Sequence, residues 1–406
     1  MLKLLRGVFI MKIRLLLPLF LSFSLISCQT NNPELITHIV DGDFIGSEFV
    51  FPMNTVTQLR MYYQDQYDEV VTGFDNIVKN VSKEVDRYHN YSGINNLKTI
   101  NDSCGTNQEI VISNELFDVL KEAIDLTILT KGKFNLAIGK LIDLYSDKVS
   151  EELSGTFNTL PDESILSDVL SGIPSYEDIK DVVVLNEENN TVTLNKYNGR
   201  NVIISLGAIA KGYVMQQAYE YLKIYNYPAL FDAGSSTMGM IGEKPSNKDK
   251  NYNIVLNNPS LSDSSDTMLK LSLYNDHFIS TSGDYNQYFF YSKDNEKKMM
   301  HHIIDPYTGV SNNYIRNVTL VSTDISMSIL DALSTAIFNC YNDKEVTEII
   351  SDISNNYNGS ISYMICKPYY ENSIINYDKF NVLMSESFSL LINGNVSDTI
   401  IDTKII

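Results

Sequence analysis

Positive charge is scarce in this chain of 406 residues, which holds 31 lysines and arginines against 50 aspartates and glutamates. The formal net charge is −19 at pH 7. A chain with this much negative charge repels polyphosphate backbones, so a general role in nucleic-acid binding is disfavoured. A bulky acidic partner is disfavoured for the same reason. Local positive charge around one small phosphate site stays compatible with this balance.

Cysteine is almost absent too, with four residues in the whole chain. One of them, Cys28, belongs to the amino-terminal segment. The other three are odd in number, and their spacing matches no zinc-binding pattern: Cys104, Cys340 and Cys366. The sequence therefore predicts reduced, buried thiols and disfavours a disulfide frame, a metal site or redox chemistry at these positions.

Long hydrophobic runs are missing except near the amino terminus, where residues 15–26 are apolar and follow four basic residues. This run is too short to be a convincing membrane-spanning helix and is typical of an export signal. It ends in Leu25-Ile26-Ser27-Cys28, which resembles the bacterial lipoprotein box, where the signal is cut before a cysteine that receives a lipid. A plain secretory signal with a chance cysteine is the alternative.

The amino-terminal pattern leads to an expectation for the whole chain. We expect a lipoprotein signal peptide over 1–27, a lipid on Cys28, and localisation at the cell membrane, facing outside the cytoplasm. Residues 28–47 are expected to form a polar tether, and 48–406 the folded domain. Met11 is an alternative start, because the signal is complete without the first ten residues.

The rest of the chain has a globular composition, 44% hydrophobic and 20% charged, which suits one large domain or two ordinary ones. Apolar residues recur at helical spacing over 67–88, and Ser113 is a good N-cap for a second helix. The polar segment 146–180 is expected to be irregular. After it, 182–185 and 191–194 are predicted to pair as a hairpin.

One stretch, 203–213, is expected to carry a ligand site. A β-branched run ends at Leu206 and a helical pattern follows, so the chain is predicted to turn from strand into helix between Gly207 and Gly212. The first amides of a helix lack internal partners, and Lys211 adds a full charge, which favours a phosphate group there. The alternative is an ordinary strand-to-helix connection with a surface lysine.

Two neighbouring histidines, His301 and His302, follow a short charged hairpin. Adjacent residues on a strand point to opposite faces, and no third soft ligand lies at a useful spacing, so a transition-metal site is disfavoured. One of the two is expected to act as an acid/base or hydrogen-bonding group. The alternative is a structural histidine that caps a turn.

Asp331 and Thr335 lie four residues apart in a helix predicted over about 326–339. Positions i and i+4 share a helix face, so the carboxylate and the hydroxyl point the same way. Hard oxygens of this kind, completed by a backbone carbonyl, waters and phosphate oxygens, are how proteins usually hold Mg²⁺ against a nucleotide. A solvated helix face is the alternative for this pair taken alone.

The order of these segments resembles the ApbE family, the FAD:protein FMN transferases. The resemblance covers about 48–395, includes a weaker match at Met53-Asn54-Thr55, and is specific because five motifs recur. The motifs are Leu206-Gly207-Ala208-Ile209-Ala210-Lys211-Gly212-Tyr213, Asp232-Ala233-Gly234, Thr281-Ser282-Gly283-Asp284-Tyr285, His302-Ile303-Ile304-Asp305-Pro306 with Thr308-Gly309, and Asp331-Ala332-Leu333-Ser334-Thr335.

The resemblance implies a fold and a reaction. The fold would be a single large α+β domain with mixed or antiparallel sheets and packed helices, of T-fold-like architecture. The reaction would be Mg²⁺-dependent transfer of FMN from FAD to a serine or threonine hydroxyl of an acceptor flavoprotein, with release of AMP. An exported lipoprotein that stores FAD, or hydrolyses it to FMN and AMP, is the alternative.

The resemblance also implies roles for particular residues. The backbone carbonyl of Ala208 and the side chains of Asp331 and Thr335 would hold Mg²⁺, and His302 would act as the base with Asp305 as its orienter or replacement. The residues implied in FAD binding are Met53, Tyr88, Lys133, Phe134, Asn135, Ser205, Lys211, Asp232, Gly234, Ser282, Gly283, Asp284 and Ile304.

Three positions depart from the family pattern. Ser205 and Asn135 stand where aspartates are common, which removes possible anionic hydrogen-bond acceptors for the flavin or adenine and puts affinity or cofactor preference in doubt. Asn54 stands where the family has glycine. No acceptor segment of the Asp-Gly-x-Ser/Thr-Gly-Ala type is present in this chain, so nothing here suggests self-modification.

Overall fold

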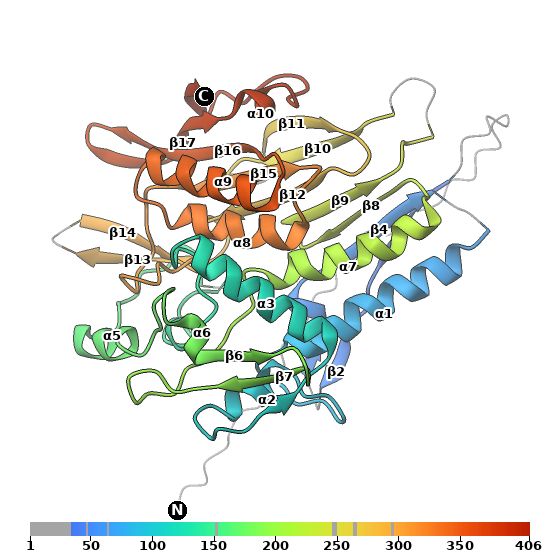
Figure 1. Cartoon of the computed structure of the whole chain (residues 1–406). Helices are drawn as coiled ribbons and strands as arrows, with labels where there is room; N and C mark the ends of the chain where they lie inside the picture. Colours follow the sequence, from blue (N-terminus) through green and yellow to red (C-terminus); the bar gives the residue numbers. More distant parts are fainter. Residues whose placement is uncertain are drawn as a thin grey trace, which may run out of the picture. The chain divides into compact units, whose positions relative to one another are not determined.

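A nine-stranded sheet forms the centre of the protein in the computed structural model (Figure 1). The structure describes residues 34–45, 48–62, 65–150, 153–245, 250–262, 266–293 and 296–406, within a unit that spans Pro33–Ile406. The predicted signal peptide and Cys28 lie outside the described residues. In spatial order the strands are β1 (Leu35–Ile39), β4 (Thr57–Tyr62), β8 (Ala229–Ala233), β9 (Thr237–Ile241), β12 (Phe278–Gly283), β15 (Asn317–Ser322), β16 (Ser362–Glu371), β17 (Ile374–Met384) and β18 (Ile400–Ile405).

The sheet is antiparallel at every pairing except the last, where β18 runs parallel to β17. Helices pack together against one face of it and share one apolar core with its strands (Figure 1). This arrangement confirms the predicted α+β class with antiparallel sheets and packed helices. The long helices are α1 (Tyr67–Val85), α3 (Asn114–Leu129), α7 (Ala210–Tyr225), α8 (Met327–Phe338) and α9 (Asp343–Tyr357).

A hairpin packs on the opposite side of the sheet, through a second apolar cluster. Its strands are β10 (Tyr252–Asn257) and β11 (Thr267–Leu273). Along β10 the residues alternate between buried and exposed, with Tyr252, Ile254 and Leu256 facing the cluster. This is the period of two expected for a strand with one covered face.

Smaller elements complete the fold. They are the strand pairs β2 (Asp43–Ile45) with β3 (Glu48–Val50) and β13 (Tyr288–Lys293) with β14 (Glu296–His301); the sheet of β5 (Ile110–Val111), β7 (Thr191–Leu194) and β6 (Val183–Asn186); the short helices α2 (Leu97–Asp102), α4 (Gly139–Asp143), α5 (Glu163–Leu170), α6 (Ile179–Val182) and α10 (Glu386–Ser389); and the 3-10 turn η1 (Pro52–Asn54).

Several local predictions are confirmed by these elements. The Oγ of Ser113 accepts the N–H of Leu116 at 3.1 Å and so caps α3. The predicted hairpin is the pair β6 and β7. Cys104, Cys340 and Cys366 are free and buried. Among the described residues, no helix is both long and apolar enough to cross a membrane.

The expected start of the folded part lies too far along the chain. The sequence predicts a tether over 28–47, yet β1 already pairs with β4, and Val40 is fully buried in the core. The polar residues in this segment interrupt the alternation of apolar and polar residues that is typical of a strand. The apolar residues of β1 are also only half covered, because β1 lies at the sheet edge. The segment predicted to be irregular, 146–180, likewise contains helix α5.

The strand expected before α7 is not formed. Residues 203–206 belong to no strand, and within them only Ile203 makes a β-bridge, to Ile138. The backbone of this segment is held by single hydrogen bonds instead: the N–H of Ser205 donates to the carbonyl of Leu136 at 2.8 Å, and that of Ile204 to Oδ1 of Asn101 at 2.7 Å. Helix α7 then begins at Ala210, close to the predicted turn.

Gly212 lies in the first turn of α7, where this helix touches α8. A Cβ at this position would come within 2.2 Å of the carbonyl oxygen of Met327, a backbone atom that has little room to move. We expect Gly212→Ala to lower the free energy of unfolding by roughly 1–3 kcal/mol, as overpacking does, in urea denaturation. The matched control is Gly207→Ala, whose Cβ meets nothing closer than Oγ of Ser205 at 3.7 Å; equal destabilisation of both variants would contradict this reading.

Candidate active site

A cavity of about 990 Å³ opens where the segment before α7, the first turn of α7 and one face of α8 meet the ends of the central strands. Its size is at the upper end of ordinary ligand pockets. Most residues predicted for the site line it, although they come from distant parts of the sequence. These are Met53, Tyr88, Lys133, Phe134, Asn135, Ser205, Ala208, Lys211, Asp232, Gly234, Ser282, Gly283, His302, Ile304, Asp331 and Thr335.

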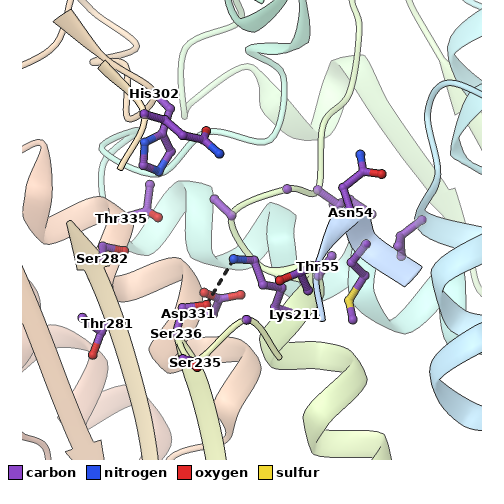
Figure 2. A pocket seen from close by; sticks show the side chains of 18 of the residues that line it. Asn54, Thr55, Lys211, Ser235, Ser236, Thr281, Ser282, His302, Asp331 and Thr335 are labelled. Atoms are coloured by element: carbon purple, nitrogen blue, oxygen red, sulfur yellow. Dashed lines mark hydrogen bonds between the residues drawn. The ribbon is translucent and has the colours of Figure 1, made fainter. Parts of the chain in front are cut away.

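Lys211 projects from the first turn of α7 into this cavity (Figure 2). Its Nζ donates a hydrogen bond to Oγ of Ser236 at 3.1 Å. Ser236 follows the turn at the end of β8, where Gly234 has φ of 61° and a Cβ would come within 2.2 Å of Oγ1 of Thr55. The glycine is therefore needed both for the turn and for the close approach of Thr55.

Asp331 lies near Lys211 on α8 (Figure 2), with 8% of its surface exposed. Its Oδ2 accepts the backbone N–H of Gly212 at 2.9 Å, which links α8 to the first turn of α7. Burial raises the pKa of Asp331 to about 6, while the charge of Lys211 and the hydrogen bond from Gly212 act in the opposite direction. The carboxylate is thus costly to ionise here and would be stabilised by a cation.

The donor set around Asp331 fits a hard divalent cation. Thr335, one helical turn later, and Ala208 line the same cavity, so the residues that would supply a carboxylate, a hydroxyl and a backbone carbonyl share one cavity wall. Among the described residues, no group of three or more His, Cys, Asp or Glu is placed to hold a metal ion. A cation at this site would accordingly depend on mixed oxygen ligands, of the kind that suits Mg²⁺ together with phosphate oxygens.

The two adjacent histidines have different surroundings. His301 is fully buried, its Nε2 lies 3.1 Å from the carbonyl oxygen of Asn312, and burial lowers its pKa to about 3. His302 points into the cavity (Figure 2). His302 is exposed to the cavity, and desolvation by the protein around its ring, followed by the charge of Lys211, lowers the pKa of His302 to about 4. His302 is therefore neutral at pH 7 and able to accept a proton.

Two of the predicted site residues do not line the cavity. The carboxylate of Asp305 accepts the N–H of Tyr307 at 2.8 Å and the hydroxyl of Tyr341, so it organises the turn after His302. Asp284 is fully buried and forms an ion pair with Arg316. Burial raises the pKa of Asp284 against the effect of that arginine. Both residues hold structure around the site rather than forming its walls.

Other predicted residues lie in the wall but are already held by the protein. Asn135 donates to the carbonyl of Pro174 and accepts from the N–H of Ala137, both at 2.9 Å. Lys133 donates to the carbonyl of Asn339 at 2.8 Å. Phe134, Ser205 and Ile304 line the cavity as well, and their backbone groups are also hydrogen-bonded within the protein, so these contacts together fix the shape of the wall.

The departure at Asn54 has a structural explanation. Asn54 has φ of 52°, in the left-handed region, and its N–H donates to the carbonyl of Phe51 at 2.9 Å. Asparagine tolerates this backbone conformation better than other residues with a side chain. The turn that glycine forms in the family pattern is thus compatible with the asparagine found here.

The sequence did not reveal how much positive charge gathers in the cavity. Six basic residues line it against four aspartates, although the chain as a whole is strongly acidic. Most of the basic residues that the sequence did not predict for the site come from α1 and β4. Their spacing along these elements does not differ from that of basic residues on an ordinary exposed face. The basic residues are Arg60, Lys79, Lys83, Arg87, Lys133 and Lys211, and the aspartates are Asp43, Asp86, Asp232 and Asp331.

Comparison with known proteins assigns the chain to a family. A model of the ApbE family matches residues 53–356. The chain belongs to the ApbE family. A relative from Klebsiella pneumoniae (strain 342), named FAD:protein FMN transferase, is 26% identical over 278 residues, which is 67% of this chain and 76% of the relative. One of the same name from Haemophilus influenzae is 27% identical over 280 residues, 67% of this chain and 73% of the relative.

Solved structures of the ApbE family share the fold. The ApbE protein from Thermotoga maritima superposes with a TM-score of 0.65 at 22% identity, covering 89% of this chain and all of that one. The flavin transferase ApbE from Vibrio cholerae gives 0.64 at 18% identity, covering 88% of this chain and all of its own. At these identities the likeness establishes the architecture, and the site has to be argued from its own residues.

Proposed function

We propose that this ApbE-family chain is a transferase that moves FMN from FAD to a serine or threonine hydroxyl of a partner protein and releases AMP. One observation supports this most strongly: Lys211, Asp331, Thr335 and His302 lie in the wall of a single cavity, although they come from three separate segments. Curated relatives named FAD:protein FMN transferase support the same assignment.

The chain's own groups account for the binding of a diphosphate. The first turn of α7 carries the positive end of the helix dipole, and Lys211 lies in that turn. Asp331, Thr335 and the carbonyl of Ala208 would hold Mg²⁺. When bound, Mg²⁺ supplies Lewis-acid polarisation of phosphoryl oxygens. The aromatic and apolar wall residues Tyr88, Phe134 and Ile304 are then available for the rings.

Proton transfer falls to His302 in this proposal. The acceptor hydroxyl attacks the phosphorus on the FMN side, the bond to the bridging oxygen breaks, and AMP leaves with that oxygen. The attacking hydroxyl must lose its proton, and neutral His302 in the cavity wall is placed to accept it. Asp305 contributes by holding the turn that follows His302.

The proposal is tested with the chain lacking residues 1–28, incubated with FAD, Mg²⁺ and candidate flavoprotein acceptors. Covalent, fluorescent flavin on an acceptor is the expected result. Free FMN and AMP without labelled acceptor would point to hydrolysis instead. Unchanged bound FAD would point to storage and would contradict transfer.

Replacement of Lys211 gives a separate prediction on affinity. We expect Lys211→Met to weaken FAD binding roughly 10- to 100-fold, which corresponds to the loss of one charged hydrogen bond. Isothermal titration with FAD measures it. Lys223→Met, at the other end of α7, removes a lysine that bonds to Tyr219 outside the cavity and serves as the control. Equal affinities in the Lys211 variant and the control would contradict the role of Lys211.

We also propose that the protein acts outside the cytoplasm, tethered through a lipid on Cys28. The support is the sequence Leu25-Ile26-Ser27-Cys28 after a basic and apolar segment. Its acceptors would then be flavoproteins exposed at the same membrane face. Mass spectrometry of the amino-terminal peptide tests this, and an unmodified Cys28 would contradict the anchor.

A further inference from the structure

Strand β10 presents an open edge to the cavity. In the part of the chain that the structure describes, β10 pairs with β11 and with no second strand. Five consecutive residues, 253–257, line the cavity. Figure 1 shows the hairpin as a separate pair of arrows beside the large sheet. One wall of the site is therefore a strand edge, with the row of backbone donors and acceptors that such an edge carries.

The pairing of β11 shows which way the backbone groups of β10 point. On its far side, the N–H of Ser272 donates to the carbonyl of Leu391, and the carbonyl of Lys270 accepts the N–H of Asn393, each at 2.8 Å. In an antiparallel ladder the residues alternate in the side to which they direct N–H and C=O. Lys270 is opposite Val255, so the N–H and C=O of Val255 point away from β11, toward the open edge.

We propose that an extended segment of the acceptor protein, carrying the hydroxyl that receives FMN, pairs with β10 at Val255 as an added strand. This inference rests on the proposed function and names how its protein substrate is held. A strand adds at a spacing of about 4.8 Å, whereas a helix is about 10 Å wide, so an extended chain is the form of polypeptide that best fits beside the edge within a cavity also occupied by FAD. Strand addition is a common way to recognise such segments.

Alternation explains how the hydroxyl would be delivered. Ile254 and Leu256 point toward the central sheet, while Val255 is 44% exposed on the outer side. Side chains of an added strand would alternate between the two faces in the same way, so every second side chain would point inward. This inward face would lie toward Thr281 of β12 and Thr319 of β15, which line the cavity. A serine or threonine at an inward position would enter the site, and small neighbours would be required beside it.

The first experiment uses the full-length protein with Mg²⁺, FAD and a synthetic 12-residue peptide that contains an Asp-Gly-x-Thr-Gly-Ala segment. Val255→Pro removes the outward N–H at a position where proline is tolerated, because that N–H makes no bond to β11. We expect the KM for the peptide to rise roughly three- to tenfold, the effect of one backbone hydrogen bond, with the Kd for FAD changed by less than about twofold. Val255→Thr, which keeps the N–H and a β-branched side chain, should stay within about twofold of the wild-type KM.

A second measurement tests pairing from the peptide side. N-methylation of successive peptide residues should raise KM at alternate positions, because only every second N–H faces β10. A uniform effect, or none, would overturn strand pairing. A parallel loss of FAD affinity in Val255→Pro would also overturn it, since the edge would then bind the dinucleotide. Labelling of folded acceptors but not of the peptide would overturn the extended segment alone, whereas no labelling of either would remove the proposed function.

Discussion

Asp331→Ala is expected to abolish Mg²⁺-dependent transfer of FMN, with a rate at least about 10³-fold below wild type. The carboxylate is the only acidic group that α8 contributes to the cavity wall. A cation held there would stabilise the charge that develops in the transition state by several kcal/mol. Each 1.36 kcal/mol of the activation free energy corresponds to about a tenfold change in rate. Single-turnover formation of fluorescent, covalently labelled acceptor measures the loss.

Asp331→Asn separates chemistry from folding in this test. Its amide oxygen can still accept the N–H of Gly212, which Oδ2 of Asp331 accepts at 2.9 Å, so the link between α7 and α8 is retained. The variant is expected to unfold at a temperature near that of wild type and yet to lose transfer. Wild-type rates at saturating Mg²⁺ in Asp331→Asn would remove the proposed metal role.

His302→Ala is expected to retain FAD but to lower kcat for transfer by roughly 10²- to 10⁴-fold, the usual contribution of a general base. The matched control is His301→Asn, because His301 is buried against Phe338 and is not among the residues lining the cavity. That variant should lose stability while its kcat changes little. Loss of FAD binding in His302→Ala would instead make His302 a contact of the ligand.

The pH dependence of transfer follows from the same residue. His302 must be neutral to accept a proton, and its pKa is lowered to about 4 by burial and then by Lys211. At saturating Mg²⁺, which would keep Asp331 ionised although burial raises its pKa to about 6, the value of kcat/KM should therefore stay level from pH 7 down to about 5 and fall only as the pH approaches 4. In His302→Ala this acidic limb should disappear. An acidic limb near pH 6.5 in wild type would contradict the lowered pKa.

The parts of the site that depend on local spacing could be predicted from the sequence. Asp331 and Thr335 share a helix face because four residues make about one turn, and Ser113 caps α3 because its hydroxyl reaches the third amide of the helix. The segments near Lys211 and His302 were likewise found through their turn residues. Each of these signals is contained within a few neighbouring positions.

The parts that depend on distant pairing could not be predicted. Asp284 follows a strand and belongs to a family motif, but only the fold places Arg316 beside it and removes it from the cavity wall. Strand β1 carries half-covered residues at a sheet edge, so its pattern is weak until β4 is known as its partner. The direction of the backbone groups along β10 likewise becomes known only from its pairing with β11 and from the bonds that β11 makes to Leu391 and Asn393.

The contact between α7 and α8 affects how the free energy of substrate binding would be used. Gly212 permits the two backbones to touch, and its N–H holds the carboxylate of Asp331. The spacing between the proposed cation ligands and the first turn of α7, where we propose that phosphate binds, is thereby fixed by the fold. In the proposed reaction, little of the binding free energy of FAD would go into ordering this pair of helices, which would leave more of it to align the reacting phosphorus with the incoming hydroxyl.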